Sequence, residues 1–333
     1  MFNFVIDSTD AAHADIPNIG PEDYVRVFTR GDYNWCLQAY LILAKRNRLP
    51  VCCTNRLLSD KINIIHSDQL LKLQGTPSEF VVCVRADYPQ RRWAHYHLVQ
   101  NMNQLGSNCT FIPHWVQPGL IKRDEHRQGV KRVAYAGAPI RGNMAGSTES
   151  WRSMFEQHGL EFVVQSSGNW HDLSTVDVLV GIRSFSTHPY NTKPPTKLFS
   201  AWHANIPFVG GYDSAFRQLG VPEEDYLLAG TPEDVVKQVL RLRDHPALYA
   251  KLVYNGQQKA CMYTEQTIAD IWEATLTGTV MHRYTQWKNH PVYEQVRFNI
   301  LQEVGLLEHT TKQMVKRLLK GSNVVPMLKK ALS

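Results

Sequence analysis

The sequence predicts an α/β protein with two Rossmann-like, doubly wound domains that face each other across a cleft, followed by a helical C-terminal tail. Its 333 residues, 43% hydrophobic and 20% charged, are enough for two globular cores. Short apolar runs of β type alternate with longer helical runs, which is typical of a parallel sheet covered by helices. A polar segment marked by proline and glycine interrupts the alternation once. We therefore place the domains at residues 1–128 and 129–280 and the tail at 281–333.

The first unit alternates from Tyr24 onward. We expect strands at "YVRVFT", "LPVCCT", "INIIHS", "EFVVCVRAD" and "CTFIPHW", and helices at "WCLQAYLILAKRN" and "RRWAHYHLVQNMNQLG". After the polar segment "VQPGLIKRDEHRQG", strands are expected at "VKRVAYAGA", "LEFVVQ", "VDVLVGI" and "IPFVGG". The helices between and after them are "STESWRSMFEQHG", "KLFSAWHA" and "TPEDVVKQVLRLRDH". Two such units of similar size predict a ligand site between them.

Composition narrows the function classes. The net charge of +6 suits a phosphate-bearing ligand and does not require nucleic acid, for which no recognition motif is present. No apolar run approaches the ~20 residues of a membrane span, and the first residues lack the pattern of a signal peptide. The six cysteines show no metal-ligand spacing and mostly lie in apolar runs, as reduced, buried side chains do. We expect a cytoplasmic protein.

The strand "VDVLVGI" leads into the most informative stretch of the chain. From residue 178 to residue 212 there is no Asp or Glu, whereas Arg183, Lys193 and Lys197 are present. Ligands of open α/β sheets gather beyond the carboxyl ends of the strands, and a helix N-terminus attracts anions. We expect Thr196 to cap a helix that begins near Lys197, and Asn205 to end it in the left-handed conformation. The stretch predicts a phosphate site.

Several segments resemble GT-B glycosyltransferases, in particular the family 4-like retaining enzymes. The main one is "KPPTKLFSAWHANIPFVGG", and the others, in the same order as in that family, are "GDYNWCLQAYLILAKRN", "FIPHWVQPGLIKR", "VAYAGA" and "STVDVLVGI". The resemblance implies transfer of a sugar from a nucleotide-sugar donor held by the second domain to a saccharide or lipid-linked acceptor on the first. It also implies donor contacts from Gly137, Ser200 and Thr196, besides the two lysines. Retention of configuration is the outcome it favours.

The sequence departs from the family at the donor site. Two glutamates eight positions apart are replaced by Thr192 and Ser200, and the arginine after the first glycine is replaced by Ala138, with Arg141 as the nearest cation. These replacements leave two alternatives open: an epimerase or hydrolase on the same fold, or a catalytically silent sugar-nucleotide-binding protein. In the transferase, Lys197 and Arg183 would stabilise the charge that grows on the leaving diphosphate.

The acceptor side is expected around "TRGDYNW" and the strand ends of the first domain. Arg30 and Gly31 would lie across the cleft from Lys197, and Asp32 is the candidate general base if the reaction inverts. His114 follows a predicted strand and could also face the cleft, as could His66, although lone histidines are more often structural. Trp170 and Tyr190 are candidates for stacking on a base or a sugar.

No metal is expected to take part. The sequence has no Asp-x-Asp, and His95 and His97 would lie on different faces of the predicted helix. Residues 309–333 carry six Lys or Arg and no Asp or Glu, interleaved with apolar residues. This tail is either a terminal helix packed on the body or a weak contact with the anionic inner face of a membrane.

Overall fold

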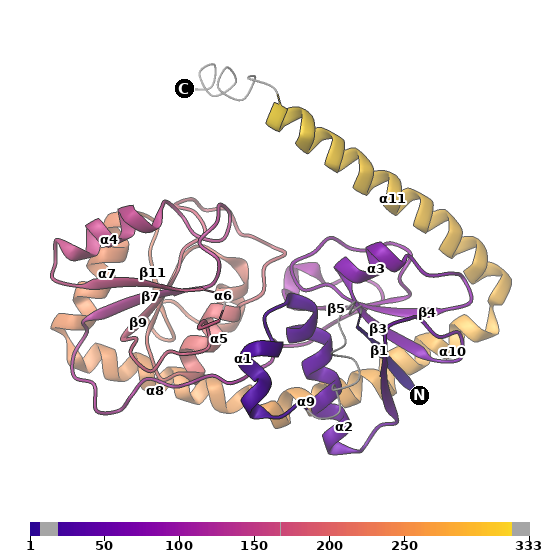
Figure 1. The fold of residues 1–333 in the computed structure, drawn as a ribbon, viewed down its shortest axis with the longest axis horizontal. Coiled ribbons are helices and arrows are strands. Elements are labelled where there is room, and N and C mark those ends of the chain that lie inside the picture. Colours follow the sequence, from indigo (N-terminus) through magenta and orange to yellow (C-terminus); the bar gives the residue numbers. More distant parts are fainter. Residues whose placement is uncertain (7–18, 167, 322–333) are drawn as a thin grey trace.

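The computed structural model describes residues 1–6, 19–166 and 168–321, which form two α/β domains side by side (Figure 1). Each domain has one parallel sheet, in the order β2-β1-β3-β4-β5-β6 in the first and β11-β10-β9-β7-β8 in the second. The strands of the first sheet are β1 (Phe2–Val5), β2 (Val51–Thr54), β3 (Ile62–His66), β4 (Phe80–Val84), β5 (Tyr96–Val99) and β6 (Cys109–Phe111). Those of the second are β7 (Arg132–Ala136), β8 (Glu161–Gln165), β9 (Val178–Gly181), β10 (Phe208–Gly210) and β11 (Leu227–Leu228).

Helices cover the sheets. Those of the first half of the chain are η3 (Pro21–Asp23), α1 (Tyr24–Val27), the π-helix η4 (Tyr33–Leu37), α2 (Gln38–Arg46), α3 (Ser67–Leu73) and η5 (Met102–Gln104). The second domain contributes α4 (Thr148–Glu156), α5 (Thr196–His203), α6 (Ser214–Leu219), α7 (Pro232–Asp244) and α8 (Pro246–Met262). The chain continues with α9 (Glu265–Thr275), the π-helix η6 (Leu276–Val280), α10 (Met281–Asn289) and α11 (Pro291–Gly321). Within the described ranges, none of these helices is long and apolar enough to cross a bilayer.

Two expectations for the first domain are wrong. The strand β1 precedes Tyr24, where the predicted alternation begins, and pairs with both β2 and β3 as an interior strand next to the edge of the sheet. Residues Tyr24–Val27 form a short helix in place of the predicted strand, and none of its side chains is buried. A strand in the middle of a helix-covered sheet must be apolar on both faces, and "FNFV" meets that demand with only one polar residue, Asn3.

The segment "RRWAHYHLVQ" is also not a helix. Its residues Tyr96–Val99 form the buried strand β5 between β4 and β6. His95 accepts a hydrogen bond on Nδ1 from the amide of Val81 (3.0 Å), and His97 contacts the carbonyl of Arg91 through Nε2 (3.1 Å). Burial lowers the pKa of His97 to about 3 and lowers that of His95 well below its ordinary value. Both are neutral core residues.

The domain division at residue 280 needs correction. Ile268, Trp272 and Val280 lie in the core of the first domain, together with Phe4 and the other apolar residues of β1. The chain therefore crosses back to the first domain after α8, and α9, α10 and the start of α11 cover that domain (Figure 1). The physical reason is that the apolar stripe of α9 needs a partner, which the second domain, already covered by α8, does not offer.

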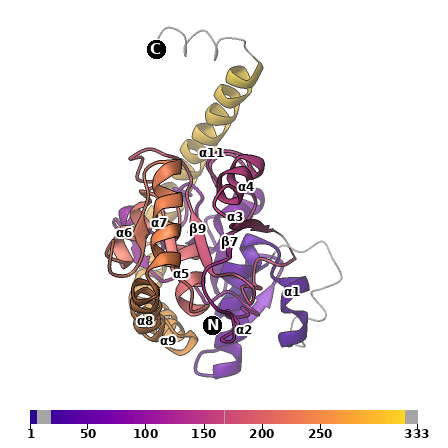
Figure 2. The ribbon, with the colours of Figure 1, turned by 90° about the vertical axis from the view of Figure 1, so that its left-hand side faces the viewer.

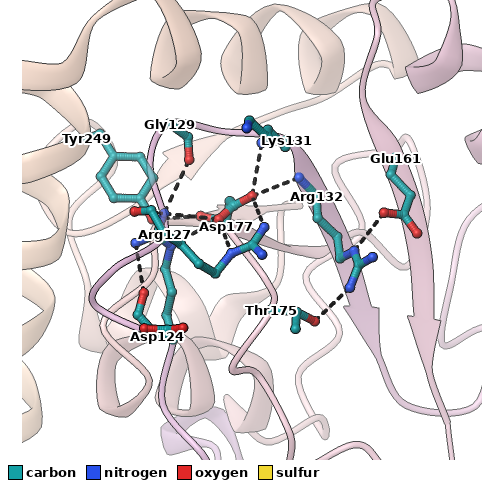
Figure 3. Close-up of polar contacts among 10 residues, drawn as sticks. Asp124, Arg127, Gly129, Lys131, Arg132, Glu161, Thr175, Asp177 and Tyr249 are labelled. Carbon is teal, nitrogen blue, oxygen red and sulfur yellow. Dashed lines mark hydrogen bonds and ion pairs between the residues drawn. The ribbon is translucent and has the colours of Figure 1, made fainter.

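The first crossing, by contrast, is fixed by charge. Asp177, fully buried just before β9, accepts hydrogen bonds from Arg123 (3.1 Å) and Arg127 (3.0 and 2.9 Å), two residues of the connecting segment. It also accepts from the backbone amides of Lys131 (2.9 Å) and Arg132 (2.8 Å), as Figure 3 shows. Burial alone would raise the pKa of the Asp177 carboxyl, but the hydrogen bonds from Arg127 and the two amides hold it below its ordinary value. The linker is thus anchored to the second domain.

Candidate functional site

A cavity of about 390 Å³ lies between the two domains, at the carboxyl ends of their strands. This is the edge at which open α/β sheets bind their ligands. The first domain contributes Thr29, Gly31, Asn34, Trp35, Asp87, His114 and Gln117. The second contributes Tyr135, Ala136, Gly137, Ala138, Asn143, Trp170, Arg183, Lys193, Pro194, Thr196, Lys197 and Ser200.

Lys197 is the charged centre of this cavity. Its ammonium nitrogen lies 4.6 Å from the centroid of the Tyr135 ring, and no carboxylate of the described residues lies within ion-pair distance of it. Burial, with a smaller contribution from the nearby Arg183, lowers the pKa of Lys197 to about 7 against the opposing effect of Asp213. A desolvated cation without a counter-ion is stabilised by an anionic ligand, so this position suits a phosphate.

Gly137 lies where β7 ends, close to the lysine. Its φ of +132° is a conformation that side-chain-bearing residues rarely adopt, and its amide donates to the carbonyl of Gln165 (2.7 Å). A Cβ at this position would lie 3.6 Å from the Lys197 ammonium. The glycine therefore keeps the floor of the cavity open in front of the cation.

Arg183 and Lys193 also line the cavity, but each already has an acidic partner. The predicted acid-free interval ends one residue before Asp213, whose carboxylate lies 2.6 Å from Arg183 Nε, with both side chains buried. Burial raises the pKa of Asp213 in spite of Arg183. Lys193 pairs with Asp87 of the first domain at 2.6 Å. Three cations thus face two carboxylates, which leaves one unbalanced positive charge.

The turn before α5 is held by the first domain. Fully buried Asn101 donates to the carbonyl of Lys193 (3.0 Å) and to the hydroxyl of Ser214 (2.9 Å), and its carbonyl accepts from Gln218 (3.1 Å). Asn103 donates to Asn191 (2.7 Å). The phosphate-site turn therefore keeps its position relative to the first domain through side-chain amides, which sequence inspection did not single out.

The helix α5 begins one residue earlier than expected. Pro195 is its N-cap and no side chain caps it, so the prediction that Thr196 is the cap is wrong. Thr196 is the first helical residue and lines the cavity together with Lys197 and, one turn later, the buried Ser200. The prediction for Asn205 is confirmed: its φ is +60°, just after the C-cap of the helix.

On the first-domain side, the structure separates the four candidates. Gly31 and His114 line the cavity, whereas Arg30 and Asp32 do not. The buried carboxylate of Asp32 accepts hydrogen bonds from Arg30 (2.9 Å) and from Gln69. As a general base, Asp32 would have to leave these partners, so the structure does not favour that role.

His114 is a neutral group at the cavity wall. Its Nδ1 donates to the carbonyl of Trp115, and its ring meets Trp35 edge to face with centroids 4.3 Å apart. Burial lowers the pKa of His114 to about 4, so the imidazole is uncharged near neutral pH. Its Nε2 can therefore accept a hydrogen bond from a sugar hydroxyl without adding charge to the site.

The remaining candidates divide in the same way. Trp170 lines the cavity, but Arg141 is exposed on the loop after β7 and is not part of the wall. Tyr190 lies beside Arg183, with its ring centroid 6.0 Å from the guanidinium carbon, outside the lining. His66 is buried against Tyr88, also away from the cavity.

Two residues that line the cavity and contact its cations were missed, and a signal existed for one of them. Asp87 follows "FVVCVR" at the carboxyl end of β4, the same position relative to a strand that led us to the second-domain cations. Tyr135 lies inside β7 with no distinguishing mark, and its contact with Lys197 depends on the packing of α5.

No family model and no curated protein matches this sequence. Among solved structures, the chain is similar to HepE of Anabaena in complex with UDP and glucose, at a TM-score of 0.52 and 12% identity over 83% of this chain and 99% of HepE. The complex of HepE with UDP-glucose gives 0.52 and 13% over the same shares. TarM gives 0.47 and 12%, and the chain spans 57% of its length.

The similarity to HepE, together with the two facing parallel sheets, defines the fold as GT-B, the fold of a large class of glycosyltransferases. The predicted fold class is therefore confirmed, including the helical C-terminal region. At this level of identity the likeness concerns the fold, and function has to be argued from the cavity itself.

Proposed function

We propose that this protein is a glycosyltransferase that moves a sugar from a nucleoside-diphosphate sugar to a saccharide or lipid-linked acceptor. The observation that carries the proposal is the ammonium of Lys197, which faces the inter-domain cavity without a carboxylate partner among the described residues. A donor diphosphate would supply the missing negative charge. The second domain would hold the donor and the first domain the acceptor.

The chemistry follows from where negative charge grows. Cleavage of the bond between the anomeric carbon and the phosphate leaves charge on the diphosphate, and a fixed, partly desolvated cation stabilises that charge more than the ground state. Lys197 would make the direct contact. Arg183 would add to it from its position beside Asp213, and the free amides at the start of α5 would bind a phosphate oxygen.

The finer points of the proposal concern the stereochemistry of the reaction and its metal requirement. We propose a metal-independent reaction, because the protein places cations where a metal-dependent enzyme would use a divalent ion. We propose retention because the resemblance to the family 4-like enzymes implies it. Among the described residues, no three His, Cys, Asp or Glu side chains group as metal ligands. Neutral His114 and the backbone at Gly31 would contact the acceptor or the transferred sugar. Contact of the basic tail with an anionic membrane stays a prediction, and residues 322–333 of that tail lie outside the described chain.

Calorimetry with the ligand series tests the proposal. UDP should bind, since UDP-glucose and UDP are the ligands of HepE, whereas uridine should bind much more weakly. Lys197→Ala should reduce UDP affinity by ~10²-fold and leave uridine affinity nearly unchanged, because a charged hydrogen bond is worth about 1.5–3 kcal/mol. The control Lys237→Ala, at an exposed position on α7, should change neither. Equal losses for UDP and uridine would show that Lys197 acts through folding.

Product analysis separates the three activities that the sequence left open. With UDP-, GDP-, ADP- and CMP-sugars and EDTA present, a transferase releases the nucleotide and forms a glycoside when a saccharide acceptor is added. An epimerase converts the donor without release, and a silent binder leaves it unchanged. Activity that disappears with EDTA and returns with manganese would refute metal independence.

A further inference from the structure

The long helix α11 carries an apolar stripe that the described chain does not cover. The stripe consists of the exposed residues Tyr293, Ile300, Val304, Leu307, Met314 and Leu318. They recur at multiples of three or four, so they lie on one face of the helix over about 38 Å. The exposed fractions of Leu307 and Leu318 are 69% and 68%, and apolar area of this extent usually marks an interaction surface.

The opposite face of the helix is the one that holds it to the first domain. Phe298 is fully buried there, and Gly305 packs so closely on Trp93 that a Cβ would lie 2.8 Å from the indole. Arg92 pairs with Glu308 at 2.7 Å. Beyond that point α11 projects from the body, as both views show (Figures 1 and 2). The stripe therefore faces outward both where the helix is attached and where it is free.

The charges beside the stripe are arranged in two halves. Glu303 and Glu308 flank the attached half on opposite sides, one residue before Val304 and one residue after Leu307. In the projecting half, Arg317 lies 14 residues, almost four turns, after Glu303 and so on the same flank. Lys312 lies one turn after Glu308, on the other flank. Each flank thus carries an acid in the attached half and a base in the projecting half.

We propose that α11 pairs with α11 of a second copy of this chain in an antiparallel arrangement centred near Thr310. Reversal about that residue brings Glu303 opposite Arg317 of the second copy and Glu308 near its Lys312. The same reversal places Ile300 near Leu318, and Val304 near Met314, of the second copy. Both the apolar and the charged contacts are then satisfied in one register, and each occurs twice by symmetry.

The charge pattern argues against two other partners for the apolar stripe, a parallel second copy and an anionic membrane. A parallel pair would set Glu303 near Glu308 of the other copy and the basic halves of both copies beside each other, which is repulsive. An anionic membrane would attract Lys312 and Arg317 but repel Glu303, which flanks the same stripe. The proposal does not depend on the glycosyltransferase activity, so the two can fail separately.

Sedimentation of the full chain measures the association directly. The wild type should be a dimer at tens of micromolar, and Leu307→Asp, at an exposed position, should be a monomer with an unchanged circular dichroism spectrum. The charge reversals Glu303→Lys and Arg317→Glu should each weaken the dimer, and the double variant should restore it, because it re-forms the pair in both copies. A monomeric wild type overturns the proposal, as does a double variant weaker than either single one.

Disulfide cross-linking tests the direction of pairing. In a Cys261→Ser background, which removes the one exposed cysteine of the described chain, Thr310→Cys should form a disulfide-linked dimer. Asn299→Cys should not, because antiparallel pairing about residue 310 separates the two copies of position 299 by about 33 Å. Equal cross-linking at both positions would indicate a parallel pair. Binding of a monomeric wild type to phosphatidylglycerol vesicles would identify lipid as the occupant and refute the second copy.

Discussion

Replacing Lys197 by methionine should stabilise the ligand-free protein while it abolishes diphosphate binding. The side chain keeps its length and apolar stem in the variant but loses the charge that the cavity desolvates. Because Lys197 has no carboxylate partner among the described residues, no ion pair is broken by the change. Only the contact with the Tyr135 ring is lost, and such contacts contribute about 0.5–1 kcal/mol at partly exposed sites.

The magnitude follows from the pKa of the lysine. The pKa of Lys197 falls from 10.5 to about 7 on folding. At pH 6, where the ammonium is charged, this fall lowers the free energy of unfolding by at most about 5 kcal/mol. Lys197 keeps partial contact with solvent in the cavity, and water screens part of this energy. We therefore expect Lys197→Met to raise the free energy of unfolding by ~1–2 kcal/mol at pH 6.

The pH dependence of the stability gain of Lys197→Met tests its sign independently. Below pH 7 both the folded and the unfolded wild type hold the proton, so the gain is complete there. Between pH 7 and 10.5 the folded protein loses the proton before the unfolded chain does, so the gain shrinks toward zero. Urea unfolding at pH 6 and pH 9.5 measures it, with Lys237→Met as the control at an exposed position. A variant less stable than the wild type at pH 6, or equally stabilised at both pH values, would refute the reasoning.

Three further predictions concern charge and packing. The affinity for UDP should be highest below pH 7 and fall by up to tenfold per pH unit above it, because Lys197 of the unliganded protein loses its proton there. Titration calorimetry at pH 6, 7 and 8 measures this, and an affinity that does not change with pH would show that the lysine is not involved. Asp177→Asn should lower the free energy of unfolding by ~3 kcal/mol at neutral pH. The difference should shrink as the pH falls below the ordinary pKa of an Asp carboxyl, where the unfolded wild type takes up the proton, and should disappear only below the lowered pKa of the folded carboxyl. Gly256→Ala should lower the free energy of unfolding by ~1–3 kcal/mol, because its Cβ would lie 2.8 Å from Trp202. The control Gly278→Ala, with open space around it, should leave the free energy of unfolding unchanged or raise it when both variants are measured by the same urea unfolding.

The sequence was informative where a local rule decides the structure. Asn205 ends a helix because few residues tolerate φ near +60°, and the parallel sheet follows from the alternation of β-type and helical runs. Lys197, which lines the cavity, was singled out because it belongs to a stretch without acids that follows a buried strand. In each case the residues that decide the feature are neighbours along the chain.

Prediction failed where distant contacts decide the structure. "YHLV" at 96–99 reads as part of a helix until its backbone is paired with β4 and β6, the strands before and after it, and no residue of the segment itself indicates that pairing. The partner of Lys193 comes from the other domain, so its neutralisation by Asp87 is not visible in a stretch chosen for lacking acids. Counting charges along the chain singled out residues that line one cavity but overstated the positive charge there.

The return of the chain to the first domain determines the order in which the two domains fold during synthesis. The sheet and the helices of the second domain are complete once residue 262 has left the ribosome, whereas the first domain still lacks α9, with Ile268 and Trp272, from its core. Domains generally fold as units during translation, with the N-terminal one first. Here we expect the reverse: the second domain becomes protease-resistant while the first waits, partly formed, for a helix encoded more than 200 residues after its first strand.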